Sequence, residues 1–477
     1  MRPGQVHEVP VPTLALGRLR PLIGDRRFAE LEMAAEDTRA ALAGTTVWNV
    51  NSTATGGGVA EMLQVLVGYI LDAGVDARWL VIHGDPDFFT VTKRLHNRIH
   101  GVAGDDGGLG AEEAAVFERT AAANAEPVVS AVRPGDIVLL HDPQTAGLAA
   151  PLAAAGARVV WRCHIGTEQA DQWTQQAWSF LRPYLQACDG FVFTRRAYVP
   201  SWVPDDRVWV IPPSIDPFSP KNEDITFLDR AHILGRLGVT SELPGEPPGV
   251  FTRRDGTIGR VTRAATIVAE GDPLDPVAPL VVQVSRWDHL KDMRGVMLGF
   301  AGEVVDRTDA HLLLVGPSVE GVTDDPEGAV VLAECVDTWR SLPARARRRV
   351  RLVSLPMDDV DENAAMVNAL QRQAEVIVQK SLAEGFGLTV AEAMWKAKPV
   401  VASAVGGIVD QVEPGTGVLL DDPTDLEAFG RALASLLEQP DLVATLGARA
   451  HRHVLAGFVG DTHLLHYAAM MQRLIAG

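Results

Sequence analysis

Two glutamates separated by seven residues, Glu384 and Glu392, are the side chains most suited to bind a polar ligand in this sequence. Glycines stand beside the first of them, at Gly385 and Gly387, and glycine lets backbone N–H groups approach an anion closely. A helix is expected over residues 388–396, and the unpaired N–H groups at its start also favour negative charge. The stretch therefore predicts a site for an anionic ligand.

Both glutamates also have purely structural explanations. Thr389 and Glu392 have the spacing of a capping box, in which the two side chains close the start of a helix. Glu384 could instead be a solvated charge on a loop. From the residues alone, these alternatives stay open beside the binding role.

A pair of cations follows an apolar strand expected at residues 280–285. Arg286 comes directly after this strand, and Lys291 follows five residues later. Two cations just beyond a strand end suit a diphosphate, since each neutralises negative charge in a dry site. The structural alternative is a surface ion pair with Asp288 or Asp292.

A glycine-rich loop near the amino terminus is a further candidate for anion binding. It contains Gly56, Gly57 and Gly58 and leads into a helix expected over residues 62–71. The loop lacks the spacing of a dinucleotide-binding motif and the Lys-Ser/Thr of a P-loop, so both of those sites are disfavoured. Glu61, just after the loop, is either a ligand-binding residue or a carboxylate in the first helical turn.

Polar residues recur where expected strands end. Asp142 follows a strand expected at residues 136–140, and His164 follows one expected at residues 159–162. The carboxyl ends of parallel strands meet at one edge of a sheet, where doubly wound folds bind their ligands. Both residues are therefore candidates for the site, although Asp and His in such loops can also serve as caps.

The elements that must position these residues alternate between strand and helix. An Asp-Gly turn predicts a hairpin over residues 251–261. Two runs of alternation, divided near residue 218, predict an α/β fold with two doubly wound domains. Further strands are expected at residues 45–49, 78–82, 190–194, 208–211, 311–315, 349–354, 376–378 and 399–403, and helices at residues 26–42, 88–100, 361–373, 423–437, 441–455 and 463–475.

Composition narrows the function classes. A length of 477 residues is sufficient for two domains, and 61 acidic against 43 basic side chains argue against a nucleic-acid-binding surface. The three cysteines are widely spaced and fit neither a disulfide framework nor a metal site, which favours the cytoplasm. No signal-peptide pattern and no apolar run of about 18 residues is present, so no membrane association is expected.

Six motifs occur in a consistent order: NSTATGGGVAEML, HDPQTAGL, WRCHIG, IPPSIDP, VSRWDHLKD and EGFGLTVAEAM. The first five together resemble the trehalose glycosyltransferring synthases. The sixth, with its two glutamates separated by seven residues, resembles the signature of retaining glycosyltransferases of family 4 with the GT-B fold. The resemblance spans residues 45–470 and implies two Rossmann-like domains that face a deep cleft. It implies an acceptor-side domain at residues 1–217, a nucleotide-sugar-binding domain at residues 218–456, and a final helix at residues 457–477 that returns to the first domain.

The resemblance also implies roles for the candidate residues. Glu384 would lie at the donor sugar, Glu392 would bind the ribose hydroxyls, and Arg286 and Lys291 would bind the donor phosphates. In the first domain, His164 would contact the donor sugar and Asp142 would bind an acceptor hydroxyl. The remaining positions expected at the donor and acceptor are Gly56, Gly57, Gly58, Glu61, Gly385, Phe386, Gly387 and Leu388.

The implied reaction transfers glucose from a nucleoside diphosphate glucose to glucose with retention, which forms α,α-trehalose. We expect no tightly bound cofactor and no dedicated metal site, although Mg²⁺ carried by the diphosphate is compatible. The expected partners are these small molecules and a second copy of the chain in a homodimer. Open alternatives are a trehalose phosphorylase, a family member with another acceptor, a sugar-nucleotide epimerase on the same fold, and a binding protein without catalysis.

Overall fold

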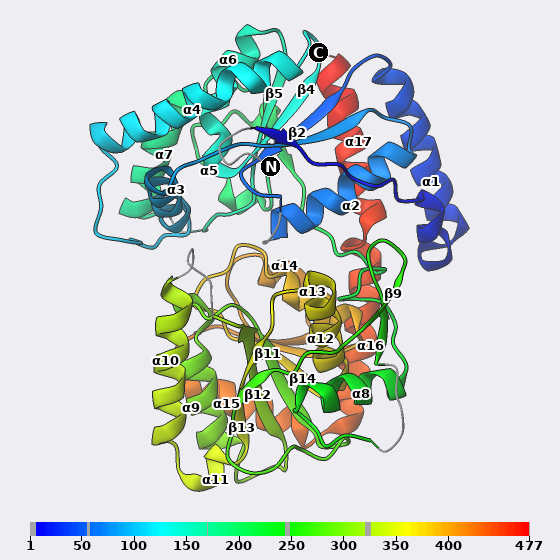
Figure 1. Ribbon diagram of the computed structural model, residues 1–477, viewed down its shortest axis with the longest axis vertical. Helices are drawn as coiled ribbons and strands as arrows, with labels where there is room; N and C mark the ends of the chain where they lie inside the picture. The colour runs from blue at the N-terminus through cyan, green and yellow to red at the C-terminus, as the bar shows by residue number, and fades with distance from the viewer. Residues whose placement is uncertain (1–5, 55–57, 169, 244–248, 320–325, 477) are drawn as a thin grey trace. The chain divides into compact units, whose positions relative to one another are not determined.

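The computed structural model of the chain describes residues 6–54, 58–168, 170–243, 249–319 and 326–476. The chain divides into two compact units, which we call unit 1 (Met1–Ile215 with Phe458–Gly477) and unit 2 (Asp216–Gly457). Each unit has a seven-stranded sheet with helices on its faces (Figure 1). Among the described residues, no helix combines the length and the apolar character needed to cross a bilayer.

The sheet of unit 1 has the strand order β1-β3-β2-β4-β5-β6-β7. Only the short β1 pairs in the antiparallel sense, and every other neighbouring pair is parallel. The central strands read as nearly continuous apolar runs because helices cover both faces of the sheet. The strands are β1 (His7–Glu8), β2 (Val47–Asn51), β3 (Ala77–Val81), β4 (Ile137–His141), β5 (Arg158–Cys163), β6 (Gly190–Phe193) and β7 (Val208–Val210).

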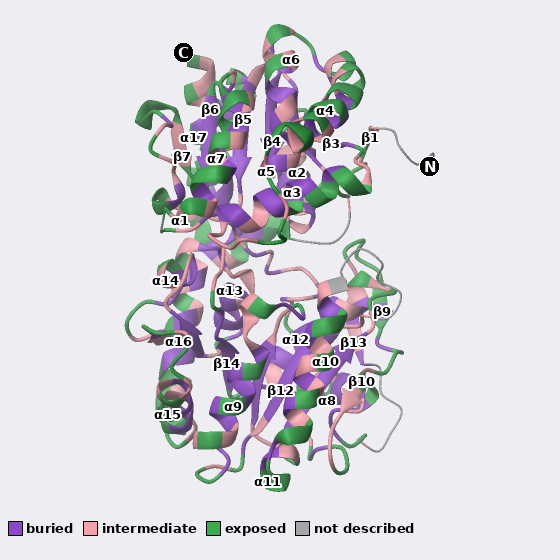
Figure 2. Cartoon of the chain, turned by 90° about the vertical axis from the view of Figure 1, so that its left-hand side faces the viewer, coloured by how far each residue is buried: buried purple, intermediate pink, exposed green. Residues whose placement is uncertain are grey.

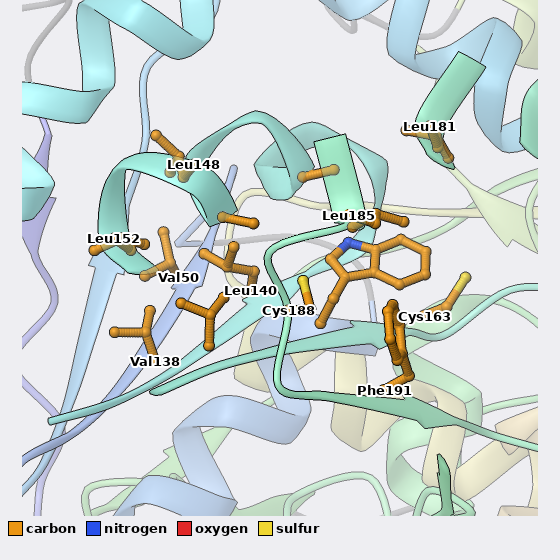
Figure 3. Packing of buried hydrophobic residues seen from close by; sticks show 14 of the residues in the cluster. Val50, Val138, Leu140, Leu148, Leu152, Cys163, Leu181, Leu185, Cys188 and Phe191 are labelled. Carbon is orange, nitrogen blue, oxygen red and sulfur yellow. The ribbon is translucent and has the colours of Figure 1, made fainter. Parts of the chain in front are cut away.

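The core of unit 1 lies between this sheet and its covering helices. Figure 3 shows side chains of β4, among them Val138 and Leu140, packed against Leu148 and Leu152. The last helix of the chain, α17, belongs to this unit and lies beside α1 (Figure 1). The helices are α1 (Arg20–Ala41), α2 (Gly58–Asp72), α3 (Pro86–Ile99), α4 (Ala111–Ala131), α5 (Asp142–Thr145), α6 (Ala149–Ala154), α7 (Gln172–Leu185) and α17 (Gly460–Ala476).

The sheet of unit 2 has the order β10-β13-β12-β11-β14-β15-β16, and only β10 pairs in the antiparallel sense. Its strands are β10 (Thr266–Val268), β11 (Leu280–Val284), β12 (His311–Pro317), β13 (Val350–Leu355), β14 (Val376–Gln379), β15 (Val400–Ser403) and β16 (Gly417–Leu420). Two further strands, β8 (Val250–Thr252) and β9 (Ile258–Arg260), form the hairpin expected from the Asp-Gly turn.

Helices cover both faces of this second sheet, and Figure 2 shows that buried residues concentrate in the strands while exposed residues lie on the outer helices. The helices of unit 2 are α8 (Phe227–Leu237), α9 (Met293–Glu303), α10 (Pro326–Ser341), α11 (Ala344–Arg347), α12 (Val360–Gln373), α13 (Leu388–Trp395), α14 (Ile408–Gln411), α15 (Leu426–Leu437) and α16 (Pro440–Gly457). Strand β10, which precedes the expected opening strand of this domain, was not anticipated because it is a short edge strand with little buried surface.

Candidate functional site

Asp142 and His164 lie together at the carboxyl edge of the unit 1 sheet. They follow the adjacent parallel strands β4 and β5, and the His164 backbone N–H donates to Asp142 Oδ1 at 2.9 Å. Asp142 has a φ of 62°, in the left-handed region that residues other than glycine rarely adopt. Such strain persists only where the surrounding structure holds it, and it concentrates at functional sites.

The pKa of the Asp142 carboxyl lies close to neutral pH. Burial raises its pKa to about 6, while the hydrogen bond from the His164 N–H and the charge of Arg162 oppose that rise. The carboxyl is thus mostly ionised at neutral pH. An ionised carboxyl in such surroundings can accept strong hydrogen bonds from hydroxyl groups.

The His164 ring is held by hydrogen bonds at both nitrogens. Arg162 Nε donates to Nδ1 at 3.3 Å, and Nε2 lies 2.9 Å from Nδ1 of His141, whose own Nε2 lies 3.1 Å from Asn49 Oδ1. Burial, followed by the charge of Arg162, lowers the pKa of His164 well below its usual range. A ligand at this position would therefore contact a neutral His164 ring of fixed orientation at the ring edge, or would contact the His164 backbone.

The glycine-rich loop is only partly described. Gly56 and Gly57 lie outside the described residues. Gly58 is exposed and begins α2, and Glu61 lies half-buried in the first turn of that helix.

Lys291 and Glu384 meet at the carboxyl edge of the unit 2 sheet. They follow the neighbouring parallel strands β11 and β14, and Lys291 Nζ lies 2.6 Å from Glu384 Oε2. The side chains are only 15% and 13% exposed. The same oxygen accepts from Ser381 Oγ at 3.2 Å and lies 3.4 Å from Gln379 Nε2. The alternative that Glu384 is a solvated loop charge is therefore wrong.

The residue after Lys291 anchors it to the sheet. Asp292 has a φ of 43° and caps α9 by accepting from the Gly295 N–H at 3.1 Å, and its other oxygen binds the fully buried Lys380 ammonium. The Lys291 carbonyl accepts from Gln283 Nε2 at 2.8 Å. These contacts fix the backbone from which Lys291 reaches Glu384.

Arg286 is half-exposed and forms an ion pair with Asp288, which is the structural alternative to phosphate binding. Its guanidinium lies 2.8 Å from Asp288 Oδ2, and Asp288 also accepts from the Leu290 N–H. An ion pair with this much exposure contributes little free energy, so it does not prevent the guanidinium from turning to a phosphate.

The loop after Glu384 is closely packed. The Gly385 carbonyl accepts from the Gly407 N–H at 3.0 Å, and Gln411 binds the carbonyl of the buried Phe386. Gly387, with a φ of 81°, is the N-cap of α13, and Leu388 is the first residue of that helix. These contacts hold the loop in place up to the start of α13.

The proposed capping box of α13 is wrong, because Gly387 and not Thr389 is the N-cap. Thr389 instead donates its hydroxyl to Gln379 Oε1 at 3.0 Å. Glu392 is 6% exposed, its Oε1 lies 3.5 Å from Lys221 Nζ, and its Oε2 has no hydrogen-bond partner among the described residues. A buried carboxylate oxygen without a partner has the capacity to accept a hydrogen bond from a ligand.

A buried ammonium lies beside Glu392. Lys396 Nζ donates to the Glu392 carbonyl at 3.1 Å and to Asn222 Oδ1 at 2.9 Å. Burial lowers the pKa of Lys396 to about 7. This lysine and Lys221 both place positive charge near the Glu392 carboxylate.

The sequence analysis missed the polar residues that support the candidates from within the core. For those that lie in strands, which are Asn49, His141, Arg162, Gln283 and Gln379, the only signal was a polar side chain inside an otherwise apolar segment. Lys221, Lys380, Lys396 and Tyr467 lie outside the strands and had no such signal.

Comparison with known proteins identifies the family of the chain. Residues 49–200 match the family described as "Trehalose synthase, N-terminal domain", and residues 361–453 match "Glycosyl transferases group 1". The chain is 34% identical to the trehalose synthase of Rubrobacter xylanophilus, over 93% of each chain. It is 33% identical to that of Thermococcus litoralis, over 95% of each.

More distant proteins share the fold. The trehalose phosphorylase of Pleurotus pulmonarius is 26% identical over 88% of this chain, which corresponds to 56% of the phosphorylase. The solved UDP-forming α,α-trehalose-phosphate synthase of Burkholderia xenovorans superposes with a TM-score of 0.65 at 15% identity, over 91% of this chain and 100% of that one. The two parallel-sheet units thus have the GT-B fold of glycosyltransferases, and the chain belongs to the trehalose synthase family.

Proposed function

We propose that the protein is a retaining glycosyltransferase that transfers glucose from a nucleoside diphosphate glucose to glucose, forming α,α-trehalose. The relatives named trehalose synthase support the product. The observation that carries the donor assignment is the pair of Lys291 and Glu384 at the carboxyl edge of the unit 2 sheet. It is supported by Glu392 in the helix that follows, whose buried Oε2 has no hydrogen-bond partner among the described residues.

In this proposal, unit 2 binds the nucleotide sugar. Lys291, Arg286 and the amino-terminal N–H groups of α13 stabilise the negative charge that develops on the leaving diphosphate. One such preorganised donor is worth about 10²- to 10³-fold in turnover. Mg²⁺ bound to the diphosphate is compatible with this arrangement, and its contribution is measured by adding EDTA.

Glu384 and Glu392 take the hydroxyl groups of the donor. When the diphosphate attracts the Lys291 ammonium, the Glu384 carboxylate becomes available to accept from sugar hydroxyls. Glu392 Oε2 accepts from a ribose hydroxyl and thereby satisfies a buried oxygen that lacks a partner in the described chain.

Unit 1 binds the acceptor in this proposal. The Asp142 carboxylate accepts from an acceptor hydroxyl, and His164 contacts the donor sugar. Glu61 and the start of α2 lie in the segment that follows the glycine-rich loop and complete the acceptor side. No enzyme nucleophile takes part: the acceptor oxygen forms the new bond to the sugar carbon on the face that the diphosphate leaves, and its proton passes to a phosphate oxygen of that leaving group.

A panel of donors tests the function. Purified protein is incubated with ¹³C-glucose and, in separate reactions, ADP-, UDP- or GDP-glucose or glucose 1-phosphate, and products are identified by mass spectrometry and by NMR of the anomeric carbons. The proposal expects a nucleoside diphosphate and α,α-trehalose in equal amounts. Trehalose formed only from glucose 1-phosphate, with release of inorganic phosphate, would instead establish a phosphorylase.

Two other outcomes would also reject the proposal. A disaccharide of different linkage or composition would identify another acceptor. A changed nucleotide sugar without a new glycosidic bond would identify an epimerase.

A further inference from the structure

Arg162 is a buried cation whose hydrogen-bond partners among the described residues are all neutral. Its side chain lies in β5 and is 0% exposed. Nε donates to His164 Nδ1 at 3.3 Å, one terminal nitrogen donates to the Ile211 carbonyl at 3.3 Å, and the other donates to the Tyr467 hydroxyl. Burial of a guanidinium costs free energy. The negative charge of Asp142 offsets part of that cost, although no hydrogen bond joins Asp142 to Arg162. Stability alone does not explain this arrangement.

The guanidinium fixes the direction of a chain of hydrogen bonds. It has donors and no acceptor, so His164 Nδ1 must accept, and the proton of the neutral ring must lie on Nε2. That Nε2–H then donates to His141 Nδ1, and the His141 Nε2–H donates to Asn49 Oδ1. A single arrangement of protons therefore satisfies all four ring nitrogens of the two histidines.

Helix α17 supports Arg162 from the other side. The Tyr467 ring, 3% exposed, lies 5.2 Å beneath the Arg162 guanidinium, and its hydroxyl accepts from that group. The helix is itself fixed to α1, because Asp461 at its start lies 2.6 Å from Arg27. Tyr467 is thus held in place independently of the residues at the sheet edge.

We propose that Arg162 and Tyr467 are positioning residues of the transferase, which hold His164 as its Nε2–H tautomer and, through the His164 backbone, orient the Asp142 carboxylate. This inference rests on the proposed function, because it takes His164 and Asp142 as the groups that face the sugars. Glycosyl transfer passes through an oxocarbenium-like transition state. A neutral imidazole adds no positive charge beside it.

The first test reads the tautomer in the wild-type protein without substrate. Nitrogen NMR of ¹⁵N-histidine-labelled protein distinguishes the two ring nitrogens, and His141→Gln and His164→Gln assign the signals. The inference expects both rings to carry their proton on Nε2 at pH 7. A His164 proton on Nδ1, or an equal mixture of tautomers, would overturn it.

The second test removes one oxygen. Tyr467→Phe keeps the ring beneath Arg162 and deletes only the hydroxyl acceptor. Tyr184→Phe is the matched control, since its hydroxyl donates to Glu118 at 3.0 Å elsewhere in the same unit. The inference expects Tyr467→Phe to give mixed His164 tautomers and about tenfold lower kcat, which is the effect of about one charged hydrogen bond. Nucleoside diphosphate affinity should stay unchanged, and the control should match the wild type.

Each outcome of these tests is decisive. A folded Tyr467→Phe variant with wild-type kcat and a wild-type tautomer would overturn the inference. Should that variant fail to fold, Arg162→Lys, which keeps the charge but lacks the Nε–H, serves in its place, and the wild-type NMR result stands by itself. A wild-type protein that makes no trehalose would reject the proposed function, while the tautomer would still decide this inference.

Discussion

Replacing Glu384 by glutamine should make the protein bind free nucleoside diphosphate more tightly while it turns over more slowly. Glu384 Oε2 lies 2.6 Å from Lys291 Nζ, so a diphosphate must compete with this carboxylate for the ammonium. Glu384→Gln keeps the shape and removes the competing charge. The same change removes the carboxylate proposed to hold the sugar hydroxyls.

The size of the effect follows from the geometry of the pair. At 2.6 Å and an effective dielectric constant of about 20, the attraction between the two charges is about 6 kcal/mol before any cost of desolvation. The hydrogen bonds from Ser381 and Gln379 and the remaining hydration reduce its net value to about 1.5 kcal/mol, the range of a charged hydrogen bond. The dissociation constant of the free nucleotide should therefore fall about tenfold.

Titration calorimetry with free nucleotide and steady-state kinetics with nucleotide sugar measure the two effects. Lys291→Ala should act in the opposite sense on affinity, weakening nucleotide binding, and should lower kcat by about 10²-fold or more. Glu438→Gln is the matched control, because its exposed pair with Arg307 lies in the same unit and has no proposed role. Weaker nucleotide binding by a folded Glu384→Gln variant would refute the reasoning.

Three further predictions concern single residues. Asp142→Asn should raise the KM for glucose or lower kcat, while nucleotide affinity measured by calorimetry stays unchanged. Because burial raises the pKa of Asp142 to about 6, the kcat/KM of the wild type for glucose should fall below that pH, where the carboxyl becomes protonated. A kcat/KM that stays constant from pH 7 to 5 would contradict this. Glu392→Gln should weaken nucleoside diphosphate binding about 10- to 100-fold, and the loss should vanish with a nucleotide that lacks both ribose hydroxyls; an equal loss with both ligands would exclude the ribose role. Gly407→Ala should lower the free energy of unfolding by about 1–3 kcal/mol, since a Cβ there would lie 2.8 Å from the Phe386 Cα. Gly302→Ala is the control and should not destabilise the protein, because a Cβ at that position would have no atom within 4 Å. Denaturant titration compares the two variants.

Local patterns were sufficient to predict most of the elements. The strand expected at residues 159–162 is β5 (Arg158–Cys163), and the helix expected at residues 361–373 is α12 (Val360–Gln373). A strand buried on both faces must be a continuous apolar run, and that requirement is visible in a single chain. Short edge strands such as β10 carry no such signal, since one side of the strand meets no neighbour.

The candidate residues at strand ends could be predicted for the same reason. Asp142 and His164 are brought together because parallel neighbouring strands end at one edge, which the order of elements implies. The helix expected over residues 388–396 is α13 (Leu388–Trp395), so its start was predicted correctly. The capping box of Thr389 and Glu392, which was the structural alternative, has the right spacing in sequence but does not form. Gly387 is the N-cap in its place, with a positive φ that glycine permits.

The support behind these residues could not be predicted, because it is made of contacts between distant segments. Arg162 and Tyr467 are separated by 305 residues, and no local pattern links a charge in an apolar strand to a tyrosine in the last helix. Lys380 has the same character, since it is fully buried and its partner Asp292 lies 88 residues away. A buried charge requires a partner whose position depends on the complete fold. A charged residue inside an apolar strand run therefore predicts that a supporting partner exists, and the structure is needed to identify that partner.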